Sequence, residues 1–221
     1  FKASSYAELC LAVPQAAASS FERCAIIEEY IPGDEYSCEG ISFAGEHKLL
    51  AFTTKFTTGA PHFIETGHNE PADIPADKLE AVSRSILTAL DALHIEYGAS
   101  HTEFMLTPEG EARIIEIGAR MGGDCIGSDL VYLSTGMDYT AMVIAAALGE
   151  RPDRTVKRAP SPAQIRFIFT KGDLEVWEET RRRAPDSIWR ASIGEMSFFA
   201  SGAVMGRGAS AFSIVRASRT I

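Results

Sequence analysis

The stretch from Glu103 to Gly123, EFMLTPEGEARIIEIGARMGG, contains two apolar runs separated by a short Pro-Glu-Gly-Glu segment. Apolar runs flanking a short segment with glycine are typical of a β-hairpin. If Glu109 and Gly110 form the tip, Glu103 faces Glu116 across the two strands. Directly opposed side chains have Cβ atoms about 5 Å apart, so two carboxylates at these positions repel each other.

A pair of opposed acids needs a physical reason. A shared Mg²⁺ is the simplest, because magnesium is held by one or two carboxylates together with water and substrate phosphates. Two alternatives are a pair that shares a proton and two solvated strand glutamates without a function. The prediction depends on register, since a one-residue bulge at the turn would place Glu103 and Glu116 on opposite faces.

The composition is that of a globular protein. With 221 residues, of which 46% are hydrophobic, the chain can bury one core or one core and a small appendage. A net charge of -9 disfavours nucleic acid as a partner. The longest apolar run, Ala141 to Leu148, is far shorter than the roughly 20 residues that span a bilayer, so we expect no membrane partner.

The four cysteines are widely separated and form no C-x-x-C pair, which favours reduced thiols in a cytoplasmic protein. The chain begins at Phe1 without methionine, and its first residues lack the features of a signal peptide. We therefore expect a piece of a longer protein.

Apolar spacing and turn residues predict an order of elements for the first 150 residues. The expected elements are a helix at 6–19, a buried strand at 24–29, strands at 35–43 and 48–56, a long polar loop at 57–72, a helix at 75–94, the hairpin, and a helix at 137–148.

Prolines at 152, 160 and 162 suggest a linker, so we divide the chain into 1–150 and a small α+β subdomain at 151–221. The second part is expected to hold strands at 164–170, 188–193, 197–200 and 212–217 and a helix at 174–183, with Trp177 and Trp189 in its core.

Two motifs resemble the ATP-grasp superfamily, and within it the carboxylate-amine ligases that join amino acids. Glu116-Ile-Gly-Ala-Arg-Met-Gly-Gly123 is similar to the family's E-[IN]-x-x-R-x-G-G stretch, and it follows the acidic residue of a neighbouring strand. The segment from Glu28 to Glu35, EEYIPGDE, is similar to the family's nucleotide hinge. The resemblance covers about residues 1 to 150. It implies an α+β fold, the C-terminal half of an ATP-grasp domain with an antiparallel sheet flanked by helices.

The resemblance assigns the nucleotide and metal residues. Glu103 and Glu116 would hold Mg²⁺, or Mn²⁺ in its place, against the ATP phosphates. Adenine would lie on the hinge, Glu35 would bind the ribose hydroxyls, and Lys55 would reach the phosphates. The hinge residues are Glu28, Glu29, Tyr30 and Ile31. From the residues alone, a plain β-turn and an exposed strand lysine are the alternatives.

The resemblance also assigns the substrate groups. Arg120 would stabilise the negative charge that develops as the γ-phosphate passes to a carboxylate. Gly122 and Gly123 would let backbone N–H groups approach the same anions. Glu65 and His68 match an E-x-x-H element that lines the amino-acid pocket. His101 lies on the same predicted strand face as Glu103, which suggests a supporting role.

The expected reaction joins a carboxylate and an amine through an acyl phosphate, with ADP and phosphate as products. The substrates would be small molecules such as amino acids, and a homodimer is a possible assembly. The resemblance places a domain and a glycine-rich phosphate loop before Phe1, so the chain alone is expected to be inactive. Relatives carry asparagine where this chain has Gly118, which removes one ligand for a second metal. A biosynthetic ligase or carboxylase with another acceptor and a non-catalytic nucleotide-binding module are the rival interpretations.

Overall fold

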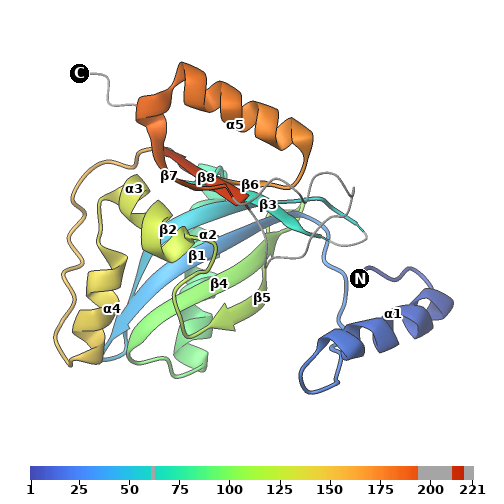
Figure 1. Ribbon diagram of the computed structural model, residues 1–221. Helices are drawn as coiled ribbons and strands as arrows, with labels where there is room; N and C mark the ends of the chain where they lie inside the picture. Colours follow the sequence, from blue (N-terminus) through green and yellow to red (C-terminus); the bar gives the residue numbers. More distant parts are fainter. Residues whose placement is uncertain (61–62, 194–210, 217–221) are drawn as a thin grey trace.

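The computed structural model describes residues 1–60, 63–193 and 211–216. Its strands pair antiparallel in one eight-stranded sheet with the order β5-β4-β1-β2-β3-β6-β8-β7 (Figure 1). The strands are β1 Asp34–Phe43, β2 Glu46–Thr57, β3 Glu65–Glu70, β4 Gly98–Leu106, β5 Ala112–Gly118, β6 Ala163–Ile168, β7 Ile188–Ser192 and β8 Ala211–Arg216.

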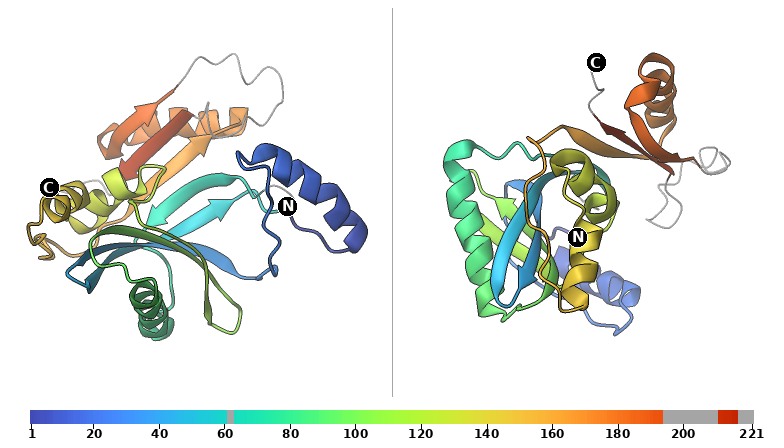
Figure 2. Two further views of the ribbon diagram at one scale, coloured as in Figure 1. Left: turned by 90° about the horizontal axis from the view of Figure 1, so that it is seen from below. Right: turned by 90° about the vertical axis from the view of Figure 1, so that its left-hand side faces the viewer.

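Helices lie on both faces of this sheet, as the right-hand view of Figure 2 shows for α2 and α4. The helices are α1 Tyr6–Ser19, α2 Ala76–Ala92, α3 Val131–Thr135, α4 Tyr139–Ala147 and α5 Lys171–Arg183, with a π-helix at Ile126–Leu130 and a 3-10 turn at Pro185–Ser187. The α+β class with a helix-flanked antiparallel sheet is confirmed.

Two apolar clusters hold the helices to the sheet. On one face, α2 buries Val82, Ile86 and Leu90 completely. These side chains recur every four residues and so form one stripe along the helix. They pack against Tyr36 of β1 and Phe104 of β4. On the other face, α4 and the segment before it pack on the far ends of β1, β2 and β4.

Most predicted elements are present with nearly the predicted bounds. Helix α1 matches its prediction and continues through Pro14, with Ser5 accepting a hydrogen bond from the Glu8 N–H at its start. Strands β1, β2, β4 and β5, helices α2 and α4, and the later β6, α5, β7 and β8 are also confirmed. The predicted strand at 197–200 lies outside the described residues.

The predicted buried strand at 24–29 is wrong. This segment has no strand pairing, and Ile26 and Ile27 are 84% and 62% exposed. An apolar run forms a buried strand only where a neighbouring strand and a core are available, and the described residues offer it neither.

The predicted loop at 57–72 is also wrong, because it contains β3, which pairs with β2 and with β6. Its sequence, Glu-Thr-Gly-His-Asn-Glu, has none of the apolar alternation that indicates a strand. The strand nevertheless lies inside the sheet, with His68 and Glu70 almost completely buried.

The β3–β6 pairing makes the sheet continuous across the predicted boundary at residue 150. The division into 1–150 and 151–221 stays a prediction. Trp177 is buried as expected, whereas Trp189 is 43% exposed. The core prediction for Trp189 is therefore wrong, because this side chain lies on an edge strand of the sheet.

Among the described residues, no single helix is long and apolar enough to cross a membrane. Taken together, the segments Ile126–Thr135 and Tyr139–Ala147 have the length and composition of a membrane span, but they meet at a bend of 119°. The second segment belongs to the α4 core described above. Ile126, Leu130 and Leu133 of the first segment are buried in a further apolar cluster with β6 and β8.

The buried hydroxyl of Tyr139 links α4 to the sheet and yields a first prediction. It donates to the Gly40 carbonyl oxygen at 2.7 Å. Tyr139→Phe removes this buried hydrogen bond, so we expect the free energy of unfolding to fall by about 0.5–1.5 kcal/mol. Urea denaturation measures the change. Tyr132→Phe, at a position 45% exposed, is the control, and equal stability of the two variants would contradict the prediction.

Candidate functional site

One face of the sheet is polar where β1, β2, β3 and β4 lie side by side. Side chains alternate along a strand, so Tyr36 and Cys38 of β1 turn to α2 while their neighbours turn to the other face. The strand register places these polar-face residues opposite polar-face residues of the next strand, as with Ser37 of β1 and Glu103 of β4. The polar row comprises Glu35, Ser37 and Glu39 of β1, Thr53 and Lys55 of β2, His68 and Glu70 of β3, and His101 and Glu103 of β4.

Lys55 lies at the centre of this row with its side chain 2% exposed. Its ammonium contacts Glu103 at 2.7 Å, Glu65 at 2.8 Å and Glu35 at 2.9 Å. Burial disfavours the ammonium, but the three carboxylates outweigh burial and raise the pKa of Lys55 above its ordinary value. The structure therefore joins four residues that the sequence assigned separately to ribose, phosphate, substrate and metal.

Glu103 also accepts from His101, whose Nε2 lies 3.1 Å from Oε1 of Glu103. These contacts lower the pKa of Glu103 to about 2, with the hydrogen bond from His101 as the largest cause, opposed by burial and supported by Lys55. Burial acts against the imidazolium of His101, yet Glu103 and Glu39 raise its pKa to about 9. The supporting role predicted for His101 agrees with these contacts.

Glu116 pairs directly with Glu103 across β4 and β5, as predicted. The turn lies one residue away from the predicted place, because Leu106 pairs with Ala112. A bulge at Ile115, between the Phe104 and Glu103 pairs, inserts the extra residue that brings Glu116 opposite Glu103. The two acids therefore meet through an irregularity in the middle of the hairpin. Two neighbouring carboxylates suit a hard cation such as Mg²⁺.

Gly122 lies against a buried acid that the sequence gave no reason to single out. Its N–H donates to Oε2 of Glu39 at 2.8 Å, and Oε1 of Glu39 bonds Nδ1 of His101. A Cβ on Gly122 would lie 2.8 Å from Nδ1 of His101 and closer still to the Glu39 carboxylate. Only glycine at residue 122 therefore lets the backbone N–H reach the Glu39 carboxylate.

The loop between β5 and the π-helix carries Arg120, which is exposed and donates to the Met121 carbonyl oxygen at 2.9 Å. Asp124 and Cys125 both have left-handed backbone, with φ of 51° and 62°. Such residues cost roughly 1 kcal/mol or more each and persist only where the surroundings hold them. The loop is therefore held in a strained shape beside the polar row.

His68 and Glu65 lie next to Asp124, another residue missed in the sequence. The Nε2 atom of His68 is 3.4 Å from Oδ2 of Asp124, and one ligand atom from each of the three lies within 4.8 Å of the others. Glu65 and Asp124 of this cluster also line the cavity described next, which a small molecule can enter. A polar substrate fits this cluster better than a second metal.

A cavity of about 250 Å³ opens beside this cluster, smaller than the roughly 300–1,000 Å³ of drug-sized ligand sites. Its wall is mostly apolar and is contributed largely by β6 and β8. The lining residues are Glu65, Asp124, Cys125, Ile165, Phe167, Phe169 and Phe212. Two acidic groups and three aromatic rings in one lining suit a small substrate with an ammonium group.

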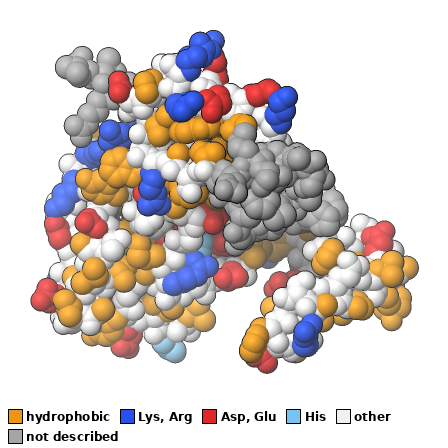
Figure 3. Space-filling model, viewed as in Figure 1, with side chains coloured by type: hydrophobic (Ala, Val, Ile, Leu, Met, Phe, Trp, Pro, Cys, Tyr) orange, Lys and Arg blue, Asp and Glu red, His pale blue; other side chains and the backbone are white. Residues whose placement is uncertain are grey.

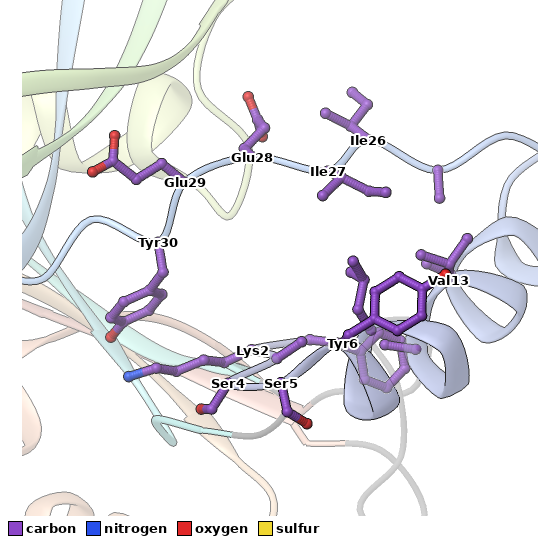
Figure 4. Close-up of a pocket in the computed structure, with 16 residues that line it drawn as sticks. Lys2, Ser4, Ser5, Tyr6, Val13, Ile26, Ile27, Glu28, Glu29 and Tyr30 are labelled. Atoms are coloured by element: carbon purple, nitrogen blue, oxygen red, sulfur yellow. The ribbon is translucent and has the colours of Figure 1, made fainter.

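The predicted adenine hinge lies on the extended segment that leads into β1. With α1 it lines a cavity of about 680 Å³. Figure 4 shows Glu28 and Glu29 pointing away from α1, whereas Tyr30 points toward Lys2, whose Nζ lies 3.8 Å from the ring centroid. In Figure 3, α1 stands apart from the rest of the surface and shows apolar side chains. Ile31 is half-buried beside this exposed segment.

Gly33 explains how the hinge joins the sheet. A Cβ at this residue would overlap the backbone carbonyl of Leu106 at the end of β4, and φ is 146°. The Pro-Gly turn therefore lets the hinge backbone approach the end of β4 closely. It places Glu35, two residues further, in the cluster around Lys55.

Glu70 is a second buried acid that sequence patterns did not indicate. It is 1% exposed, accepts from Thr53 Oγ1 at 3.0 Å, and its Oε1 has no hydrogen-bond partner among the described residues. Burial, with a smaller contribution from Glu39, raises its pKa to about 8 although Thr53 acts in the opposite direction.

Comparison with known proteins places this geometry in a family. The profile of the family described as "ATP-grasp domain" matches residues 10–129. Carnosine synthase 1 of Gallus gallus is 30% identical over 139 residues, which is 63% of this chain and 14% of that protein. Alanine–anticapsin ligase of Bacillus subtilis is 32% identical over 123 residues, covering 50% of this chain and 25% of that protein.

Solved structures share the fold. L-amino acid ligase from Bacillus licheniformis matches with a TM-score of 0.68 and 23% identity over 86% of this chain and 50% of that chain. Phosphoribosylglycinamide synthetase from Anaerococcus prevotii has a TM-score of 0.71 and 18% identity, over 98% of this chain and 56% of that chain. The chain thus spans a quarter or less of these curated relatives and about half of these solved structures.

The contact at Gly122 can be tested by adding one methyl group. Gly122→Ala places a Cβ against Glu39 and His101, so we expect the free energy of unfolding to fall by about 1–3 kcal/mol. Urea denaturation is the measurement. Gly123→Ala is a matched control, because its Cβ would meet nothing within 4 Å. Equal losses in both variants would refute the role given to residue 122.

Glu70 predicts a pH dependence of stability. Its pKa is about 8 when folded and near 4.5 when unfolded, so the unfolded chain loses this proton first as pH rises. Relative to Glu70→Gln, the wild-type free energy of unfolding should therefore fall between pH 4.5 and 8, by at least about 1 kcal/mol. Urea denaturation at pH 5 and pH 8 measures this. Glu109→Gln, on the exposed hairpin turn, is the control, and a constant difference for Glu70→Gln would exclude the shift.

Proposed function

The chain belongs to the ATP-grasp family, and on that basis we propose that the protein containing it is an ATP-dependent carboxylate-amine ligase. The cluster in which Lys55 joins Glu35, Glu65 and Glu103 is the observation that carries the proposal. It brings the groups proposed for ribose, substrate and metal within hydrogen-bond distance of the ammonium proposed for the phosphates. The names of the ligases matched in sequence support the same reaction class.

The paired carboxylates of Glu103 and Glu116 fit a divalent cation, because they lie directly opposite each other and offer only oxygen ligands. When bound, Mg²⁺ or Mn²⁺ would neutralise charge on the ATP phosphates. In the structure the ammonium of Lys55 lies against Glu103. Lys55 therefore holds this carboxylate ionised and in place before the nucleotide arrives.

The remaining residues bind and orient the reactants. The hinge from Glu28 to Ile31 would receive adenine, and Glu35 the ribose. Arg120 can turn its exposed guanidinium to the oxygens on which charge develops during transfer of the γ-phosphate to a carboxylate. Of the two glycines predicted to present N–H groups to these anions, Gly122 donates its N–H to Glu39 instead. Gly123 would contribute to the same stabilisation. Attack of an amine on the acyl phosphate would then give an amide, ADP and phosphate.

The substrates of the proposed reaction are small molecules, with amino acids as the favoured class. Glu65 lines the cavity with the aromatic wall, and His68 contacts Asp124 of the same lining. A carboxylate there would hold a substrate ammonium. A cytoplasmic location accords with four cysteines that form no disulfide. Nucleic acid and membranes are not among the proposed partners.

A nucleotide-binding module without turnover is the second candidate, and Gly118 favours it. This residue stands two positions after Glu116, and a Cβ there would lie 3.3 Å from Cγ of Arg120. No side chain at residue 118 can contribute a ligand to a second metal. A ligase or carboxylase with a different acceptor is the enzymatic alternative, because the shared fold alone does not select the acceptor.

Release of ADP by the full-length protein, measured over pairs of amino acids with Mg²⁺, tests the proposal. We expect ADP only when carboxylate and amine are both present, and a loss of at least about 100-fold in Glu116→Gln, since charge stabilisation is removed. Glu111→Gln, an exposed hairpin glutamate that contacts Arg113, is the control. Retained turnover in Glu116→Gln would refute the metal assignment, and nucleotide binding without amine-dependent ADP would favour the binding module.

A further inference from the structure

Residues 122–130 form one hydrogen-bonded unit. The N–H groups of Ile126 and Gly127 donate to the carbonyl oxygens of Gly123 at 2.8 Å and Gly122 at 3.4 Å. The N–H groups of Asp129 and Leu130 both donate to the Cys125 carbonyl oxygen at 3.0 Å. Backbone hydrogen bonds therefore join the π-helix to the C-terminal part of the loop that carries Arg120.

This unit is held at two ends. At one end the Gly122 N–H contacts Glu39 of β1. At the other, the buried carboxylate of Asp129 accepts from Nε1 of Trp189 at 3.0 Å and contacts Nη2 of Arg190 at 3.1 Å. Trp189 and Arg190 belong to β7, which lies outside the matched residues 10–129 of the family profile.

Arg190 makes a second contact with the same unit. Its Nη2 lies 2.9 Å from Sγ of Cys125, one of the two residues with left-handed backbone. The ring of Trp189 also lies 6.4 Å from that of Tyr132 in α3. Two adjacent side chains of one edge strand thus hold the strained turn and the helix that follows it.

We propose that Trp189 and Arg190 are positioning residues that act through Asp129 to fix the loop of residues 119–125 for catalysis. The proposal rests on the ligase function above. A displacement of about 1 Å at reacting groups can cost 10²-fold in rate, so loss of the β7 contacts should appear mainly in kcat. ATP binds chiefly through groups of β1, β2 and the hinge in the proposed site, so its KM should change little.

Three variants test the contacts in the full-length protein. Trp189→Phe keeps a ring and removes the donor, Arg190→Met keeps length and removes charge, and Asp129→Asn keeps an acceptor for Trp189 while weakening the pair with Arg190. We expect kcat for ADP release, per folded molecule, to fall about 10- to 100-fold in Arg190→Met. The fall in kcat should be smaller in Trp189→Phe and Asp129→Asn, which are milder changes. The KM for ATP should stay within about twofold of the wild-type value in each variant. Arg181→Met is the matched control, because Arg181 bonds Glu178 within α5.

A second measurement does not depend on ligase activity. Alkylation of Cys125, followed by mass spectrometry, should be several-fold faster in Trp189→Phe and Asp129→Asn, because the turn would open more often. If kcat and the alkylation rate of Cys125 are both unchanged in Trp189→Phe and Asp129→Asn, the proposal is overturned. Faster alkylation in a protein that makes no ADP with any substrate pair would support the positioning contacts and refute the ligase function. A lower melting temperature with unchanged kcat would show a purely structural role.

Discussion

The ammonium of Lys55, surrounded by Glu35, Glu65 and Glu103, is the interaction on which the polar face of the sheet depends. Burying carboxylates without a counter-charge is costly, and these three acids come from three different strands, β1, β3 and β4. A single cation between them lets β1, β2, β3 and β4 align with their acids on the same side. The cluster keeps more negative than positive charge, which is the electrostatic condition for attracting a metal ion together with its nucleotide.

Side-chain alternation along the same strands explains why the opposite face of the sheet is apolar. Because alternate residues of β1 and β4 turn to the charged side, Tyr36 and Phe104 are available to pack under α2. Side-chain alternation thus separates an apolar layer that stabilises the fold from a polar layer that prepares the site. The cost of the polar layer is visible in Glu70, which is buried with one oxygen lacking a partner among the described residues.

Local patterns in the sequence were sufficient for the helices and for the presence of the hairpin. Apolar spacing predicted α2, and turn residues predicted β4 and β5. The pairing of Glu103 with Glu116 was predicted, but it arises from a bulge at Ile115 that offsets a turn one residue from its predicted place. The patterns failed where burial depends on distant partners. β3 is polar but central because β2 and β6 pair with it, and 24–29 is apolar but exposed because the described chain has no strand beside it. Glu39 and Asp124 were missed for the same reason, since their roles arise from contacts with residues far along the chain.

The pairing of β3 with β6 also bears on how the chain could be divided experimentally. A protein cut after α4 would retain every residue of the family match, yet β3 would become an open edge with unpaired backbone groups next to the buried His68 and Glu70. Exposed edges of this kind recruit strands from other molecules. The shortest soluble form of this domain is therefore set by the last strands of the sheet, and shorter pieces are prone to aggregate.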